Sequence, residues 1–535
     1  MTETSRSRVW LGRTARAASG LVALGLTVVV VAAGTRAPAA DDSTVAATRV
    51  PVPPSATTLV CPGPLILPDD TGRGDSAFDP TPVAPISTLA ALTASPSGAG
   101  TVAPLDGSTT WTALKAGGDA IKVPSVAGPS VVRVQPTEVP ARVAATGSGL
   151  VTAGDLRGLA AASCQLPAGD AWLLGGATDL ASTAQLVLDN PGTTPAEVAL
   201  EVWGPNGVVD LTGERYLVAP GAERVVSLGG IAAEQRRIGV HVVATGGRIG
   251  AHVQDSALDG FTPGGTELVV PGVAPAARQV VPGISVVAST VDDPDAPLLR
   301  LLAPGGMATT AKVTLLGPAG VYELPGADSV ALGAGEVTDV PLGGLPAGSY
   351  TAVVDAGQPV LASSVMTRPG SIGELDDHPS VERAWAATAQ PGGGAAALPP
   401  GTQGTLVLGA VSSAADASDG GSATGHLRLI GAGGAVLAER TIHIPAGTTS
   451  SWTLDELAAG TGDVVPTDPA AVPVPRAGVL GVDLAVDGGA VTLAWALVAE
   501  VPRADGTLFS VLDPVPAGHT APDVPVREDA RLGTR

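Results

Sequence analysis

The sequence has almost no lysine and few aromatic residues. Lysine occurs only at Lys115, Lys122 and Lys312, and Phe, Trp and Tyr together make up 2% of the 535 residues. The formal net charge is −21, which would repel a phosphate backbone and an anionic lipid surface. Composition therefore argues against a nucleic-acid partner. Hydrophobic residues still reach 45%, so the predicted cores consist of Val, Leu, Ile and Ala.

The sequence also lacks recognisable catalytic motifs. It contains no Gly-x-Ser-x-Gly elbow, no His-Glu-x-x-His and no phosphate loop. Asp170, Asp179 and Asp189 are not arranged as an evident acid–base pair. We therefore predict a protein without enzymatic activity and without a cofactor. Catalysis by residues scattered along the chain is the alternative.

The N-terminus has the pattern of an export segment. Four arginines precede an apolar run at 17–34, which is followed by the small-residue site Ala37-Pro38-Ala39. Such a pattern is typical of a signal peptide, and the run is also nearly long enough for an uncleaved membrane anchor. Residues 1–40 are therefore predicted to be one or the other, and both place the rest of the chain outside the cytoplasm.

The chain contains two cysteines, Cys61 and Cys164. Disulfides persist in extracytoplasmic compartments, so we predict one bridge between them. It would close a loop of roughly a hundred residues, which stabilises the fold by about 4–5 kcal/mol in the chain-entropy model. Two buried free thiols are the alternative.

A segment of about a hundred residues recurs three times. Its turn motif reads Trp-Gly-Pro-Asn-Gly at 203–207, Leu-Leu-Gly-Pro-Ala-Gly at 315–320 and Leu-Ile-Gly-Ala-Gly-Gly at 429–434. The predicted organisation is a linker at 41–57, a first β domain at 58–168, repeats at 169–275, 276–381 and 382–512, and a disordered tail at 513–535.

Each repeat contains two stretches of alternating apolar and polar residues joined by a short glycine turn. If Gly246-Gly247 is a hairpin turn, His241 pairs with His252 on the polar face of the strands. Around Gly488-Gly489 the same logic places Asp483 and Asp487 on a solvent-facing stripe. One buried face requires a covering sheet, so we predict an all-β protein of tandem immunoglobulin-like antiparallel sandwiches. Short helices are expected only at 153–162 and 454–459.

His241 and His252 are the sharpest site candidate. Directly opposed strand residues have Cβ atoms about 5 Å apart, so the two imidazoles could share a metal ion. No third ligand is evident, and we favour two solvated histidines and no metal site. Trp172, Trp385 and Trp495 are predicted core anchors, which leaves few aromatic rings for stacking sugars.

Several motifs carry a family resemblance. They are Trp-Leu-Leu-Gly-Gly at 172–176, Leu-Val-Leu-Asp-Asn-Pro at 186–191, the 203–207 motif, and Val-Val-Pro-Gly at 269–272 and 280–283. The sequence resembles the uncharacterised, exported actinobacterial proteins grouped as domain of unknown function 5719. The resemblance implies an envelope setting and association with membrane glycosyltransferases of cell-wall polymer synthesis, and it supplies no catalytic residues.

From these observations we expect a non-enzymatic envelope scaffold or interaction module whose partner is an envelope protein. The alternative is a module that binds a cell-wall glycan or an exopolysaccharide.

Overall fold

The computed structural model describes residues 5–36, 48–67, 82–324, 326–373, 378–412, 421–460, 462–464, 478–518 and 524–526. They form two units, which are Met1–Val52 with Ala521–Arg535, and Pro53–Thr520. The second unit is built almost entirely of antiparallel strands, so the all-β prediction is confirmed. The predicted domain boundaries within it stay predictions.

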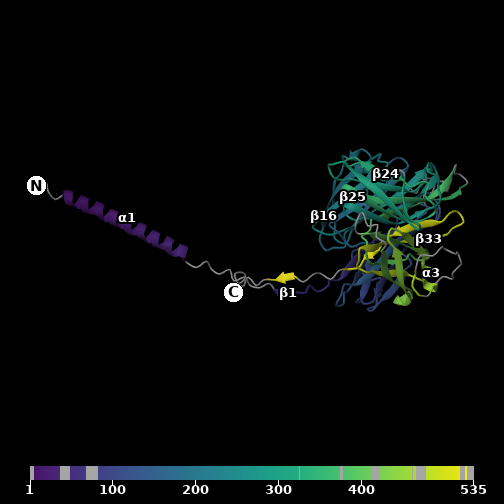
Figure 1. The fold of residues 1–535 in the computed structure, drawn as a ribbon, viewed down its shortest axis with the longest axis horizontal. Helices are drawn as coiled ribbons and strands as arrows, with labels where there is room; N and C mark the ends of the chain where they lie inside the picture. Colours follow the sequence, from purple (N-terminus) through teal and green to yellow (C-terminus); the bar gives the residue numbers. More distant parts are fainter. Residues whose placement is uncertain are drawn as a thin grey trace. The chain divides into compact units, whose positions relative to one another are not determined.

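The first unit contains one long helix and one pair of short strands. Helix α1 spans Ser5–Arg36 (Figure 1), and β1 (Thr48–Val50) pairs with β36 (Val524–Val526). None of the helices in the described part of the chain is both long and apolar enough to cross a bilayer. The predicted linker thus carries one short strand, and the predicted disordered tail at 513–535 carries two, β36 and β35 (Val515–Pro516). Residues 37–47, 519–523 and 527–535 lie outside the described residues.

The strands of the second unit fall into four successive groups, which we call copies 1 to 4. Copy 1 contains β2 (Thr57–Cys61), β3 (Ile86–Ala94), β4 (Gly100–Pro104), β5 (Thr112–Leu114), β6 (Asp119–Val123), β7 (Ser130–Val134), β8 (Arg142–Val151) and β9 (Gly158–Ser163). Copy 2 contains β10 (Asp170–Leu174), β11 (Ser182–Asp189), β12 (Ala196–Gly204), β13 (Gly207–Val208), β14 (Arg215–Val218), β15 (Glu223–Ser227), α2 (Leu228–Ile231), β16 (Gly239–Thr245), β17 (Gly250–Asp259) and β18 (Thr262–Val269).

Copies 3 and 4 complete the unit. Copy 3 contains β19 (Ala276–Val286), β20 (Leu298–Leu302), β21 (Thr309–Gly317), β22 (Gly320–Tyr322), β23 (Val330–Leu332), β24 (Val337–Pro341), β25 (Gly348–Ile372) and β26 (Pro379–Ala387). Copy 4 contains β27 (Gly394–Ala397), β28 (Gln403–Ser412), β29 (Ser422–Ile430), the short helix η2 (Ala432–Gly434), β30 (Val436–Pro445), β31 (Thr449–Thr453), α3 (Leu454–Ala459), β32 (Gly481–Val486), β33 (Val491–Val501) and β34 (Leu508–Leu512). Strand β35 (Val515–Pro516) follows and pairs with β27. In Figure 1 copy 3, with β24 and β25 labelled, lies beside copy 4, which carries β33 and α3.

One strand order is common to the four copies. Copy 1 forms the sheets β2-β7-β4-β5 and β6-β3-β8-β9, and copy 4 forms β27-β32-β29-β30 and β31-β28-β33-β34. Copy 2 repeats this order with β13 as an addition. Copy 3 repeats it with β22 as an addition and with β25 serving both sheets. The sequence shows the repeat three times, whereas the strand order occurs four times and includes the predicted first domain.

The predicted hairpins are wrong. Strand β16 pairs with β10 and β12, whereas β17 pairs with β11 and β18 in the other sheet. The chain crosses between the sheets near Gly246, whose φ of 79° suits glycine. Copy 4 crosses in the same way between β32 and β33, and β25 of copy 3 crosses as one continuous strand.

The predicted buried faces are nevertheless correct. Val240, Val242, Ile249 and Val253 all lie in one core that the two sheets of copy 2 enclose. Two strands joined by a glycine turn bury the same alternate residues whether they pair side by side or face each other across a core. Alternation alone therefore identifies the inward face but not the partner strand.

The finer immunoglobulin-like assignment is not confirmed. In the immunoglobulin order the first strand lies beside the second. In copy 1 the first strand, β2, pairs with the sixth, β7, and the second strand, β3, pairs with the seventh, β8. The first and seventh strands have in effect exchanged sheets.

The last strands of the four copies meet in a closed ring. Strand β9 contacts β18 and β34, and β26 contacts the same two strands. No backbone ladder joins these four strands within the described residues. Instead, two carboxylates accept their edge N–H groups: Leu159 N donates to Glu382 Oε1 at 3.0 Å, and Ala161 N donates to Glu267 Oε1 at 3.0 Å. Side chains thus satisfy edge groups that burial would otherwise leave unpaired.

Both ring carboxylates are almost completely buried. Glu382 and Glu267 are each 1% exposed. Burial raises the pKa of Glu382 to about 8, against the opposing effect of Arg157 Nη1 at 3.8 Å. Burial also raises the pKa of Glu267 well above its ordinary value. Burial within the ring therefore favours the protonated form of both carboxyl groups.

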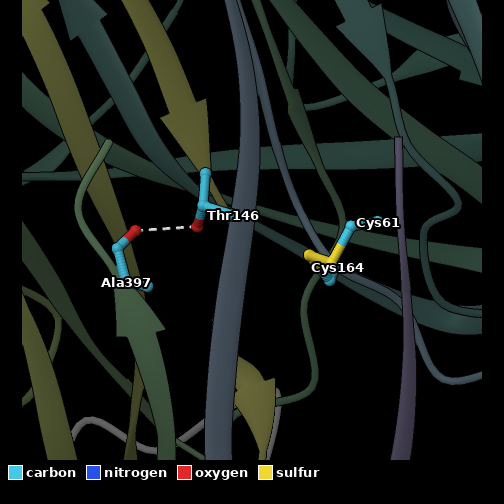
Figure 2. Close-up of a disulfide and its surroundings, with 4 residues drawn as sticks. All are labelled: Cys61, Thr146, Cys164 and Ala397. Carbon is cyan, nitrogen blue, oxygen red and sulfur yellow. Dashed lines mark hydrogen bonds between the residues drawn. A yellow bond between two sulfur atoms is a disulfide. The ribbon is translucent and has the colours of Figure 1, made fainter. Parts of the chain in front are cut away.

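The predicted disulfide is confirmed. Cys61, at the end of β2, is bonded to Cys164, just after β9, so the bridge joins the two sheets of copy 1 (Figure 2). Beside it, the Thr146 hydroxyl of β8 donates to the carbonyl of Ala397 in β27 at 2.7 Å (Figure 2). Copies 1 and 4 are therefore in direct contact next to the bridge.

Asp483 is not on a solvent-facing stripe. It is 1% exposed and is shared by the guanidinium groups of Arg428 in copy 4 and Arg142 in copy 1. Copy 1 covers the outer face of β32, which the sequence pattern had assigned to solvent. Asp487, at 58% side-chain exposure, agrees with the prediction.

One of the two predicted helices is present. Helix α3 begins with a capping box in which Thr453 and Glu456 exchange side-chain and backbone hydrogen bonds. The helix expected at 153–162 is wrong, because β9 occupies the second half of that range and no helix occupies the first half. Its alanine-rich sequence is overridden by burial among the ring strands.

A Glu382→Gln substitution should change how stability depends on pH. The folded-state pKa of Glu382 is raised to about 8, whereas the ordinary value for Glu is 4.5. Between these values only the unfolded state loses the proton, so the wild-type protein loses stability as pH rises, by up to about 1.4 kcal/mol per pH unit. In denaturant unfolding from pH 5 to pH 8, the free energy of unfolding of the Glu382→Gln variant should rise relative to that of wild type. The exposed Glu197→Gln serves as the control, and parallel curves for wild type and Glu382→Gln would contradict the assignment.

Candidate functional site

A cleft of about 850 Å³ lies between copies 2 and 3. Copy 2 contributes the segment between β10 and β11 and the turn between β17 and β18. Copy 3 contributes residues of β20, β25 and β26. Two of the lining residues of copy 3, Val365 and Trp385, also pack into the core of copy 2, so the two walls of the cleft are held together.

A buried arginine joins the two walls. Arg300 of β20 donates from Nε and Nη2 to the two oxygens of Asp339, at 2.8 and 3.1 Å, and from Nη1 to the carbonyl of Gly176 at 2.8 Å. A two-pronged contact of this kind between planar groups is among the stronger ion pairs. It fixes copy 3 against the loop of copy 2.

A second buried cluster lies beside it. Asp255 of β17 is fully buried, and its Oδ2 accepts from Arg383 Nη1 at 3.1 Å and from Trp385 Nε1 at 2.8 Å. The Arg300 guanidinium lies 5.1 Å from the centre of the Trp385 ring, a cation–π distance. The Trp385 ring is thus packed beneath a charged side chain and is not an open platform.

The rim of the cleft carries apolar side chains. Leu180, between the lining residues Asp179 and Ala181, is fully exposed, and Ile372, which pairs with the lining residue Pro379, is 60% exposed. Phe261, at the β17–β18 turn, is also 60% exposed. His378 lies at the same rim, 3.0 Å from Asp259. An apolar rim around paired charges is typical of a surface that another molecule covers.

The sequence interpretation missed this site, although one signal was available. Arg300 stands alone in Leu-Leu-Arg-Leu-Leu, and a single charge inside a strand of leucines indicates a buried partner. Its partner Asp339 is 39 residues away. Sequence alone could have predicted the need for an anion but not its identity.

The predicted histidine pair does not form. His241 in β16 lies opposite Trp172 and Glu201, whereas His252 in β17 lies opposite Val187 in the other sheet. His252 is buried, and burial lowers its pKa to about 4. The prediction of two solvated strand histidines is therefore wrong for His252, and the two imidazoles do not face each other.

His241 belongs to a small aromatic stack. Its ring lies 3.7 Å from that of Trp172, nearly parallel, and Trp203 lies 5.5 Å from Trp172. Nε2 contacts Asp170 at 3.1 Å and Nδ1 contacts Glu201 at 3.3 Å. The two carboxylates bond opposite edges of the ring, so the geometry orients the imidazole. No cluster of metal-binding side chains occurs among the described residues.

The predicted tryptophan anchors have mixed outcomes. Trp495 and Trp385 are buried, as expected, and the Trp495 indole donates to the Gly392 carbonyl at 3.1 Å. Trp172 is only half-buried and lies on the outward face with His241. The matching Ala-Trp pairs are not equivalent, because Trp172 lies in the first strand of copy 2 and Trp385 in the last strand of copy 3.

A family model described as a family of unknown function, DUF5719, matches residues 120–455. The chain belongs to this family. The resemblance predicted from the turn motifs is thus confirmed, and the whole cleft of this DUF5719 protein lies inside the matched range. No curated protein matches the chain.

One solved structure is similar to this DUF5719 protein. It is the BSP domain of a biofilm associated protein, with 9% identity and a TM-score of 0.11 over 90% of this chain and 100% of the other. That score is too low to support an argument about fold or function.

Removing the carboxylate that pairs with Arg300 should destabilise the protein strongly. Asp339→Ala leaves a guanidinium buried without its counter-charge, which costs about 3–5 kcal/mol for buried pairs. Denaturant unfolding should show this loss. Glu197→Ala, which breaks the exposed contact with Arg215, should cost less than about 1 kcal/mol. Similar losses for the two variants would contradict the role given to Arg300.

Proposed function

We propose that this protein is an exported, non-catalytic interaction module of the cell envelope, and that a protein partner docks on the cleft between copies 2 and 3. The observation that carries the proposal is the combination of a large cleft with exposed Leu180 and Ile372 at its rim. Exposed apolar groups around a polar cleft favour a partner that supplies both apolar and charged side chains.

Export is supported by two independent features. The N-terminal arginines and the apolar run at 17–34 have the pattern of a signal peptide. The disulfide between Cys61 and Cys164 suits an oxidising compartment. The family resemblance adds an expectation for the partner, which is a membrane glycosyltransferase of cell-wall polymer synthesis.

A non-catalytic role is supported by how the charges of the cleft are used. Arg300, Arg383, Asp339 and Asp255 are bonded to one another or to backbone groups. Side chains engaged in this way hold the two walls together. A candidate general acid or base needs a proton within reach of a substrate, and these groups are directed at each other.

Glycan binding is the weaker alternative. Sugar rings stack on open aromatic faces, and the Trp385 ring lies beneath Arg300 while Trp172 is stacked against His241. None of the exposed large hydrophobic side chains among the described residues is a tryptophan. The cleft therefore offers a sugar little stacking surface.

Polar substitutions at the rim should weaken partner capture. Leu180→Ser with Ile372→Ser removes apolar contact area without touching a core. Crosslinking in intact envelope, followed by pull-down and mass spectrometry, should recover a membrane partner with wild type and several-fold less with the variant. The matched control is Leu217→Ser with Val208→Ser, two exposed residues elsewhere on copy 2. Equal losses in both variants would contradict docking at the cleft. Retention on isolated cell wall that soluble polysaccharide competes away would favour the glycan alternative.

The disulfide should be intact in the protein isolated from its native compartment. Non-reducing and reducing gels should give different mobilities, and alkylation without reductant should label neither Cys61 nor Cys164. Two alkylatable thiols in the native protein would contradict the export proposal.

A further inference from the structure

A second pocket, of about 310 Å³, lies where all four copies converge. Its lining includes the segments that follow the last strand of each copy, at 163–168, 270–274, 388–393 and 513–516. These four segments occupy equivalent places in the strand order. The pocket therefore lies at one end of the ring of last strands and is built from segments that are far apart in the sequence.

The walls of this pocket are mainly apolar. They include Leu166, Ile249, Val270, Val273 and Val515, together with several prolines and alanines. No arginine or lysine is among the described residues that line it. Water inside such a space has few partners, so any polar wall group interacts strongly with whatever enters.

Two carboxylates are the charged groups of the described lining. Asp513 is half-buried as a residue, and its Oδ1 is shielded from solvent and accepts no hydrogen bond within the described structure, so Oδ2 is the carboxyl oxygen through which a ligand in the pocket could be bound. The Ser163 hydroxyl donates to the main-chain carbonyl of Asp513 rather than to its carboxyl. Burial raises the pKa of Asp513 to about 7. Asp170 has an exposed side chain whose Oδ2 contacts His241.

We propose that this pocket binds an alkylammonium group, with its apolar body against the aliphatic walls and its nitrogen donating to the Asp513 carboxylate. A cation supplies a counter-charge to the carboxylate and a donor to its Oδ2, and a charge-assisted hydrogen bond is stronger than a neutral one. An anion would meet two carboxylates and no compensating cation. A neutral hydrocarbon would leave the carboxyl without a partner.

The ammonium can belong to a free amine or to a lysine side chain of a partner protein. Both present the same chemistry, which is a primary ammonium on a chain of methylene groups. This pocket is separate from the docking cleft and shares no lining residue with it. Failure at one site therefore leaves the proposal at the other intact.

The test compares three probes of one length on the full exported chain by calorimetry. These are n-hexylamine, n-hexanol and n-hexanoate at pH 8, where the Asp513 carboxyl is largely ionised. We expect hexylamine to bind about tenfold more tightly than hexanol, as a charge-assisted hydrogen bond would give, and hexanoate not to bind. Equal affinity for the three probes, or no binding of hexylamine, would overturn the proposal.

Two substitutions at the pocket locate the effect. Asp513→Asn should abolish the preference for hexylamine over hexanol and should not disturb folding, because it removes a buried charge. Asp170→Asn is the matched control in the same lining and should retain most of the preference. Loss of the preference in Asp170→Asn alone would contradict the assignment to Asp513.

The pH dependence gives a second readout on the wild-type protein. Hexylammonium affinity should rise between pH 5 and pH 8 as Asp513 loses its proton, and it should stay flat in Asp513→Asn. Asp170 and, through it, His241 are the other titratable groups facing the pocket, so Asp170→Asn should keep the rise. A flat wild-type profile would overturn the proposal.

The two sources of the ammonium are separated with a short lysine peptide and the same peptide acetylated at Nζ. Binding of the lysine peptide but not of its acetylated form assigns the pocket to a partner's side chain. Binding of hexylamine alone assigns it to a free amine.

Discussion

The structure depends on how four edge strands are buried together. A sandwich that ends in an exposed edge strand offers unpaired N–H groups, and here β9, β18, β26 and β34 converge without a shared ladder among the described residues. Glu267 and Glu382 resolve the conflict by accepting from the backbone of neighbouring copies. Each carboxylate comes from one copy and accepts from the backbone of another, so in an isolated copy water would have to replace these hydrogen bonds. The ring is therefore a property of the four copies together.

Contacts between copies also explain why the outer faces of the sheets differ from the prediction. Alternation correctly identified which residues point into each core, including Val240 and Leu484. It assigned the opposite face to solvent, because a single sequence does not reveal that a neighbouring copy covers it. At the junction of copies 3 and 4 that face is apolar, with Val280 and Val353 packed near Val411. At the junction of copies 4 and 1 it holds Asp483 between two arginines.

Local chemistry was predictable from sequence, and long-range pairing was not. The disulfide followed from two cysteines in a chain with an export pattern, and α3 followed from its composition, with a capping box at its start. The hairpin around Gly246 failed because a glycine turn is equally suited to a tight hairpin and to a crossing between sheets. His252 lies on the outward face of β17 with Gln254, which exchanges hydrogen bonds with the backbone of Ile66 in copy 1, and it is buried although it is not part of the core. The position of Arg300 among leucines indicated that it has a buried anionic partner. That this partner is Asp339 could be seen only from the pairing of β20 with β24.

A repeated framework places variation at the junctions between copies. The strand order is shared by all four copies, and each core is filled by small aliphatic residues. Such cores tolerate many aliphatic substitutions of similar volume, so they carry little information about a partner. The junctions differ in chemistry. Between copies 3 and 4 the contact is apolar, and between copies 4 and 1 an apolar contact is combined with the buried Asp483 and its two arginines. Between copies 2 and 3, buried ion pairs lie beside an open cleft. The chemistry that distinguishes one copy from another is therefore located where two copies meet and not within the cores.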